Sequence, residues 1–386
     1  MKIVIAPNAL KGSLSAREAA DALAAGVREA LPEAERLPLP VADGGDGLLQ
    51  VLGDALQAMP MSLPVSGPAG QPVDAGWLYN RASHTAVIEL ATAAGLALPG
   101  PAGPAPMTAN TFGVGQLVLA ALDAGAQRIL LGIGGSASTD GGMGMAQALG
   151  VVFRDAHGKP LEAGGKHLIE IAAIDTGALD ARLGAVQVQV ICDVDNPLLG
   201  KHGAAAVFAP QKGASATQVA QLETGLGHFA DLLDSSLGKD VRDKPGAGAA
   251  GGLGAGAMAF LDAELQAGAE LVLDILNFDD ALSNADLVIT AEGQLDEQTA
   301  FGKAPAAVAR RARAAGVPCI AIAGCLGDGV DTLADIGITA VYALCEGPVS
   351  QQDAMRNAAG YLQTTATRAV KTFCAGREAD IQGDSD

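Results

Sequence analysis

Short, uninterrupted apolar runs alternate along this chain with segments whose apolar residues recur every three or four positions. Runs of the first kind cover residues 3–6, 128–133 and 286–290, and they predict strands buried on both faces of a parallel sheet. Residues 216–237 show the second pattern, with Leu222, Leu226, Phe229 and Leu233 on one face of a helix. The alternation predicts βα units and therefore an α/β fold.

The stretch from residue 60 to 106 interrupts this pattern. It is rich in Pro and Gly and its apolar runs are short. We interpret residues 60–75 as a crossing between domains. A length of 386 residues also favours two domains, because a domain typically has roughly 150 residues.

Composition supports layered α/β packing and excludes some partners. Nearly half of the residues are apolar (49%) but only 3% are aromatic, so the core consists mainly of Ala, Leu, Val and Ile. A formal net charge of −19 argues against nucleic acid and anionic membranes as partners, because both require basic patches. This net charge does not exclude a small anionic substrate held by a local group of lysines.

The cysteines and the N-terminal segment indicate a cytoplasmic protein. Five cysteines without a CxxC pair are typical of reduced thiols in the cytosol. The apolar run at the start is too short for a signal peptide and predicts a first strand instead.

Several segments share one design, in which an apolar strand leads into a loop of small and polar residues and a helix follows. Ligands bind at the carboxyl ends of parallel strands, where free backbone N–H groups attract anions. The most specific example is the loop from Gly134 and Gly135 through Ser136 to Asp140. The lack of a β-carbon at the glycines lets a phosphate reach the backbone, and Asp140 could bind a metal or accept a proton.

Acidic residues follow two other predicted strands. Asp43 precedes Gly44 and Gly45 and could bind Mg²⁺ or orient a hydroxyl group; the alternative is an Asp-Gly turn. Asp193 and Asp195 flank one residue, so they would face the same side of an extended chain, as a metal pair requires. Here the alternative is an Asx turn.

Three further segments are ambiguous when each is taken alone. Lys11 and Lys212 could hold a carboxylate or phosphate, or be surface lysines. Residues 246–251 match GxGxxG, but no apolar strand precedes them, so a Rossmann motif is excluded and a phosphate loop, hinge or linker remains. The loop with Glu292 and Asp296 suits a magnesium–phosphate site or contains only a surface salt bridge.

Taken together, these segments resemble the bacterial glycerate kinase family, type I, from residue 3 to about residue 330. The matching motifs, in chain order, are Leu10-Lys11-Gly12-Ser13, Val41-Ala42-Asp43-Gly44-Gly45, Asn110-Thr111-Phe112-Gly113, Gly132-Ile133-Gly134-Gly135-Ser136, Cys192-Asp193-Val194-Asp195-Asn196-Pro197, Pro210-Gln211-Lys212-Gly213, Pro245-Gly246-Ala247-Gly248-Ala249-Ala250-Gly251-Gly252 and Thr290-Ala291-Glu292-Gly293-Gln294-Leu295-Asp296. The chain has Leu10, Asp46, Thr139 and Ala291 where the family usually has an aromatic residue, Glu, Asn and Gly.

The resemblance implies two α/β domains with the active site in the cleft between them. Residues 1–70 and 285–386 would form a Rossmann-like domain with a parallel sheet, and residues 71–284 an inserted α/β domain. It also implies ATP- and Mg²⁺-dependent phosphorylation of D-glycerate, with 2-phosphoglycerate favoured over 3-phosphoglycerate. The alternatives are a kinase or phosphatase for another small hydroxy acid, or a non-catalytic sugar-acid binding protein. The protein would be a monomer or homodimer.

The resemblance and the residue types together suggest the following roles. The expected catalytic residues are Asp193, Lys11 and Asp43, and the expected metal ligands are Asp193, Asp195 and Asp43. The expected substrate-binding residues are Lys11, Ser13, Asp43, Gly44, Gly45, Asn110, Thr111 and Lys212. The expected nucleotide-binding residues are Gly134, Gly135, Ser136, Asp140, Gly248, Gly251, Gly252, Glu292, Gln294, Asp296, Thr299 and Lys303.

Overall fold

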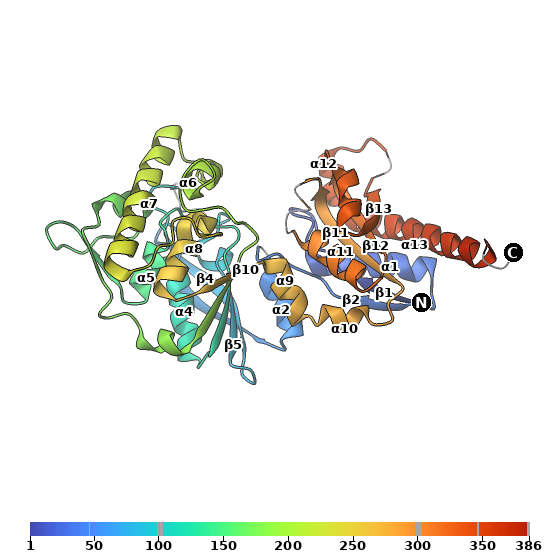
Figure 1. Cartoon of the computed structure of the whole chain (residues 1–386), viewed down its shortest axis with the longest axis horizontal. Coiled ribbons are helices and arrows are strands. Elements are labelled where there is room, and N and C mark those ends of the chain that lie inside the picture. Colours follow the sequence, from blue (N-terminus) through green and yellow to red (C-terminus); the bar gives the residue numbers. More distant parts are fainter. Residues whose placement is uncertain are drawn as a thin grey trace. The chain divides into compact units, whose positions relative to one another are not determined.

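The chain forms two compact α/β units in a computed structural model (Figure 1). Unit 1 contains Met1–Asp43 and the chain from Ala269 onward, and unit 2 contains Gly44–Gly268. The structure describes residues 1–45, 47–98, 100, 103–297, 299, 303–345 and 347–383. The α/β class and the two-unit organisation predicted from the sequence are confirmed.

Unit 1 is built on a five-stranded sheet in which every neighbouring pair is parallel. The strands, in spatial order, are β13 (Ile338–Ala343), β12 (Cys319–Leu326), β11 (Leu287–Leu295), β1 (Lys2–Ile5) and β2 (Glu35–Pro38). This is the 2-1-3-4-5 order of a doubly wound sheet, and the order reverses between β1 and β11. Ligands bind such sheets beyond the carboxyl ends of the strands at the reversal point.

Helices cover both faces of this sheet. One face carries α1 (Ala16–Ala30) and α13 (Ala358–Gly383), and the other carries α9 (Gly268–Ile275), α10 (Phe278–Leu282) and α11 (Ala304–Ala314). Ser15 caps α1 in a capping box with Glu18. The short helix α12 (Gln351–Arg356) precedes α13.

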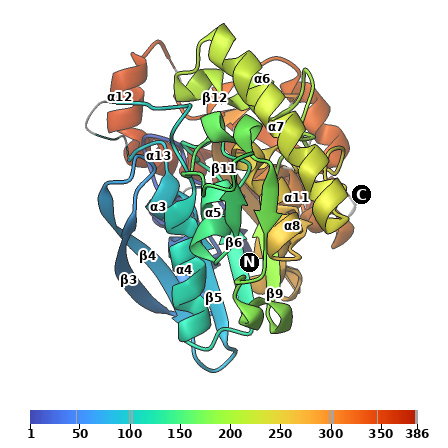
Figure 2. The same cartoon turned by 90° about the vertical axis from the view of Figure 1, so that its left-hand side faces the viewer.

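Unit 2 contains a mixed six-stranded sheet. Its strands, in spatial order, are β10 (Glu264–Gln266), β9 (Gln187–Ile191), β6 (Arg128–Gly132), β5 (Thr85–Glu89), β4 (Pro72–Asn80) and β3 (Met59–Ser66). β4 pairs antiparallel with β3 and β5, and the other pairs are parallel. The helices α3 (Ala91–Ala94), α4 (Phe112–Asp123) and α5 (Met143–Ala148) lie over one face (Figure 2), and α2 (Leu48–Ala55) contacts β4 and β5.

A second core in unit 2 lies away from the sheet. The aromatic rings of Phe153, Phe229 and Phe260 contact one another there, with centroids about 6 Å apart. They come from the hairpin of β7 (Val152–Arg154) and β8 (Ala173–Asp175) and from helices α7 (Ala216–Leu237) and α8 (Ala249–Phe260), and α6 (Ala204–Phe208) packs beside them.

The unit boundaries differ from those expected at residues 70 and 285. β3 pairs with β4 along its whole length, so residues 59–66 belong to the sheet of unit 2. Its prolines are compatible with pairing because β3 is an edge strand. At the other boundary, Leu273 and Phe278 pack in the core of unit 1. The Pro-rich composition therefore marks an edge strand and its turn, and the chain crosses between units earlier, at residue 43.

No helix in the described part of the chain is long and apolar enough to cross a membrane. All five cysteines are free thiols.

Candidate functional site

Three polar side chains gather at the strand ends of unit 1. Asn8 follows β1, Asp43 follows β2, and Glu292 lies in β11. The Asn8 amide Nδ2 donates to Asp43 Oδ2 at 3.3 Å and to Glu292 Oε1 at 3.5 Å. This group, which we call the Asn8 cluster, lies at the point where the strand order reverses. Sequence reasoning missed Asn8, although it stands in the loop that follows the first strand.

Glu292 is the buried acid of the Asn8 cluster. Its side chain is only 9% exposed, and burial raises its pKa to about 7, while Lys303 and Lys11 act in the opposite direction. Its Oε2 is buried and has no hydrogen-bond partner among the described residues. A buried acceptor without a partner is costly, so this oxygen is a suitable contact for a ligand.

Lys11 and Ser13, which were expected to bind the substrate, lie in the loop between β1 and α1. Lys11 is exposed. The Ser13 hydroxyl donates to the carbonyl of Met355 at 2.8 Å, which ties the first loop to α12. This contact gives Ser13 a positioning role.

Asp296 organises the loop that follows β11. Its carboxylate accepts hydrogen bonds from the backbone and hydroxyl of Thr299 and from Gln294 Nε2, and Lys303 Nζ lies 3.9 Å away. The segment between β11 and α11 therefore brings together Gln294, Asp296, Thr299 and Lys303, four of the residues expected to bind the nucleotide.

In unit 2, the loop after β6 packs against the segment that enters the unit. Gly134 N donates to the carbonyl of Gly44 at 3.2 Å. A Cβ atom at Gly134 would lie 2.5 Å from Gly45 Cα, and one at Gly44 would lie 2.6 Å from the side chain of Ile191. These glycines therefore permit a close approach of two backbones, whether or not a ligand contacts them. Asp46, one of the departures from the family pattern, lies outside the described residues.

Asp140 anchors the far end of the same loop. It is fully buried, and its carboxylate accepts hydrogen bonds from Thr111 N and Oγ1, both at 2.9 Å, and from Gly142 N and Gly144 N. Burial raises its pKa and these bonds lower it. Thr111 is also engaged, since Oγ1 accepts from Met145 N. Both residues hold the loop to the starts of α4 and α5, which gives them positioning roles.

Lys212 is the buried cation of unit 2. It is 3% exposed, and its Nζ donates to Ser136 Oγ at 2.8 Å and to the carbonyl of Ser138. Burial lowers its pKa to about 7, and the charge of Asp140 acts in the opposite direction. The hydroxyls of Ser138 and Thr139 are buried without hydrogen-bond partners among the described residues. An ammonium group against a loop of glycines and hydroxyls makes this a candidate anion site, which we call the Lys212 site.

The segment from Gly248 to Gly252 packs against the loop that contains Ser138. Ala250, Gly251 and Gly252 all have left-handed backbone angles. A Cβ at Gly251 would lie 2.1 Å from the carbonyl oxygen of Ser138, and one at Gly248 would lie 2.2 Å from that of Pro197. These glycines are buried, so they allow backbone packing.

The predicted metal ligands belong to different units. Asp43 is in unit 1, whereas Asp193 and Asp195 are in unit 2. Asp193 Oδ1 accepts from Gly268 N at 2.6 Å, and Asp195 is exposed. Within the ranges that the structure describes, no three acidic, His or Cys side chains gather as a metal cage. Magnesium is usually held by one or two carboxylates together with substrate phosphates, and the oxygen donors of the Asn8 cluster suit that manner of binding.

The fold and these groups define a class of α/β protein that binds small anions beyond its strand ends. The chain belongs to the glycerate kinase family, whose family model matches residues 3–374. It is 47% identical to the glycerate kinase of Halalkalibacterium halodurans over 94% of this chain and 96% of that one. It is 43% identical to glycerate 2-kinase of Escherichia coli K12, covering 97% and 99% of the two chains.

A solved structure agrees with this assignment. The crystal structure assigned to glycerate kinase 2 from Salmonella typhimurium LT2 superposes with a TM-score of 0.86 at 44% identity, and the match covers 98% of this chain and 99% of that one. The protein is therefore a kinase, and the resemblance inferred from its motifs is confirmed.

Proposed function

We propose that this kinase transfers the γ-phosphoryl group of ATP to D-glycerate in the presence of Mg²⁺, and that 2-phosphoglycerate is the favoured product. The relatives named glycerate kinase and glycerate 2-kinase support the acceptor and the position of phosphorylation. The observation that carries the proposal is the Lys212 site, where a buried ammonium group meets a loop of glycines and hydroxyls.

Phosphoryl transfer depends on positioning and charge neutralisation more than on covalent participation by the protein. Lys212, expected from the sequence to bind the substrate, is assigned here, with the Gly134–Ser136 backbone, to the phosphates of the nucleotide. Burial of Lys212 strengthens its attraction for an anion, because less water screens the charge. Asp140 and Thr111 act indirectly by holding the loop in place.

Several carboxylates have proposed roles in the reaction. Asp43, Asp193 and Asp195 are the proposed Mg²⁺ ligands. Glu292 Oε2, which has no hydrogen-bond partner among the described residues, offers a further donor. The bound ion would neutralise charge on the phosphates. Asp193 is the proposed acceptor of the glycerate hydroxyl proton, and Lys11 would pair with the glycerate carboxylate.

A coupled ADP-release assay with glycerate, tartronate and hydroxypyruvate tests the acceptor. NMR of the product identifies the hydroxyl group that is phosphorylated. We expect ADP release to depend on glycerate and on Mg²⁺. ATP should also raise the melting temperature, because a ligand that binds only the folded state stabilises it.

Two results would contradict the proposal. Release of phosphate from phosphoglycerate without any nucleotide requirement would indicate a phosphatase. Glycerate binding without turnover would indicate a non-catalytic binding protein.

A further inference from the structure

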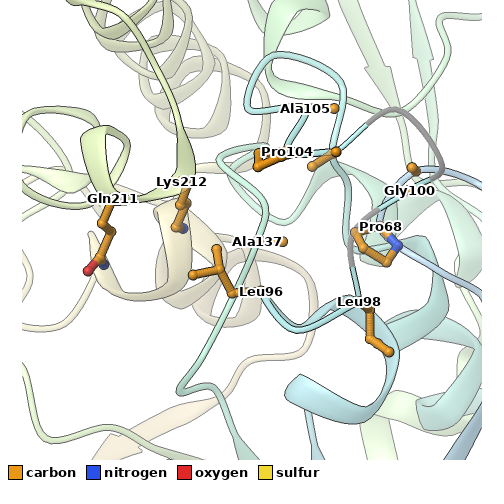
Figure 3. Close-up of a pocket in the computed structure, with 12 residues that line it drawn as sticks. Pro68, Leu96, Leu98, Gly100, Pro104, Ala105, Ala137, Gln211 and Lys212 are labelled. Atoms are coloured by element: carbon orange, nitrogen blue, oxygen red, sulfur yellow. The ribbon is translucent and has the colours of Figure 1, made fainter.

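An apolar cavity lies beside the Lys212 site in unit 2. Its volume is about 190 Å³. Its principal walls are Pro68, Leu96, Leu98, Pro104, Ala137 and Lys212. Lys212, Leu96 and Ala137 lie on one side of the hollow, and Pro68 and Leu98 lie on the other (Figure 3). The cavity thus combines hydrophobic walls with the ammonium group of an anion site.

Backbone hydrogen bonds fix these walls to the glycine-rich loop. Leu96 N donates to the carbonyl of Gly135 at 2.8 Å, and Ala137 N donates to that of Ala94 at 2.9 Å. On the opposite wall, the carbonyl of Pro68 accepts from the backbone and side chain of Asn110. The cavity and the loop therefore form one structure, in which Asn110 positions a wall residue.

Leu96 is a large apolar side chain that a ligand in this cavity could cover. It is 47% exposed although it is large and apolar, and it lines a concave site. Covering such a side chain with an apolar surface is favourable by about 25 cal/mol per Å². An apolar hollow with few convergent polar groups is the usual form of a small-molecule site.

We propose that this cavity binds the purine base of the nucleotide, with the phosphates directed toward Lys212 and the Gly134–Ser136 loop. The inference rests on the proposed function, since it assigns a place to the ATP of that reaction. A purine nucleotide has a flat base with apolar faces, joined through a ribose to anionic phosphates, and the cavity and the Lys212 site offer one surface for each end. Glycerate carries an oxygen on every carbon, so it has no apolar part for these walls to cover.

The test is the substitution Leu96→Asp, which places a negative charge at the proposed base site. Ile169→Asp is the matched control, because Ile169 is 49% exposed in the same unit and does not line the cavity. We expect Leu96→Asp to raise the KM for ATP by about tenfold or more, which corresponds to about 1.4 kcal/mol. The KM for glycerate should stay unchanged, and the control should match the wild type in both constants.

Direct binding separates the base from the phosphates. Leu96→Asp should weaken the binding of ADP far more than that of tripolyphosphate, which has no base. If Leu96→Asp does not fold, Ala69→Trp fills the same cavity from an exposed position and should give the same pattern.

The outcomes separate this inference from the proposed function. An active wild type in which both cavity variants keep the normal KM for ATP would overturn the base site, and so would a selective rise in the KM for glycerate. A wild type that binds ADP but does not phosphorylate glycerate would overturn the proposed function instead and leave the cavity test valid by ADP binding.

Discussion

Replacing Lys212 with Met should make the ligand-free protein more stable while it removes activity. The folded state must keep a charged ammonium group away from water, and burial lowers its pKa from 10.5 to about 7. Since each pKa unit corresponds to 1.36 kcal/mol, this charge costs the folded state about 5 kcal/mol at or below pH 7. Losing the two hydrogen bonds of Nζ costs about 1 kcal/mol each. The expected net gain for Lys212→Met is therefore about 3 kcal/mol.

The gain should depend on pH in a defined direction. Between pH 7 and 10.5 the unfolded chain keeps a proton that the folded chain has released, so the wild type becomes more stable as pH rises. Lys212→Met lacks this effect. The stability difference of about 3 kcal/mol near pH 6.5 should therefore shrink to roughly zero by pH 9.

Trp77 makes this measurement specific to unit 2. It is the single tryptophan of the chain and is buried in β4, so its fluorescence reports urea unfolding of the unit that contains Lys212. The control is Lys201→Met, an exposed lysine in the same unit, which should leave the unfolding midpoint unchanged. A Lys212→Met protein with wild-type or lower stability at pH 6.5, and no change with pH, would refute the reasoning about the buried charge.

The same substitution tests function. Because Lys212 is proposed to hold phosphate in a water-poor site, Lys212→Met should lower kcat/KM on the order of 10²-fold. A variant that is both stabilised and fully active would separate the buried charge from catalysis and would contradict the role of the Lys212 site.

Three further substitutions have defined expected outcomes. Asp193→Asn should lower kcat on the order of 10²-fold with the fold intact, and normal turnover in the coupled assay would remove its proposed role as base. Glu292→Gln should exceed the wild type in stability by up to about 3 kcal/mol at pH 8 and match it near pH 4.5. The reason is that the folded wild type binds a proton between pH 4.5 and about 7 that the unfolded chain releases. Circular dichroism during urea unfolding measures the stability difference, and a difference that stays constant across pH would argue against this reason. Gly251→Ala should destabilise unit 2 by about 3 kcal/mol or more, because its Cβ meets the Ser138 carbonyl. Its control, Gly200→Ala, has a similar positive φ but open space around it, so equal losses in the Trp77 assay would show that backbone strain alone is responsible.

Local pattern was sufficient to predict several of the regular elements, but not all of them. The helix predicted at residues 216–237 coincides with α7, and the strand predicted at 128–133 nearly coincides with β6. The apolar residues of α7 recur at helical spacing, and those of β6 form a continuous run, as expected for a buried strand. The antiparallel pair β3–β4 was not predicted because its prolines and glycines resemble a linker, and only pairing along an edge explains them.

The candidate site was less predictable because its contacts join distant parts of the chain. Asn8 reaches Glu292 across 284 positions through the pairing of β1 with β11. Lys212, taken alone, resembles a surface lysine in the sequence, and its burial arises from contact with a loop 74 positions earlier. Asp140 was expected to contact the nucleotide or a metal, and only the structure shows that its oxygens already accept four hydrogen bonds from Thr111, Gly142 and Gly144.

The glycines show why a glycine-rich motif need not itself contact the ligand that its sequence suggests. In a sequence, a run such as Gly248–Gly252 suggests a phosphate in contact with the backbone. In the structure, Gly251 is small because the Ser138 carbonyl occupies the space of a side chain. Ser138 in turn accepts a hydrogen bond from Lys212, so the packing that Gly251 permits supports a residue that holds the ammonium group in place. The glycine-rich segment therefore contributes to the anion site from outside it, by making rigid the loop against which Lys212 is held.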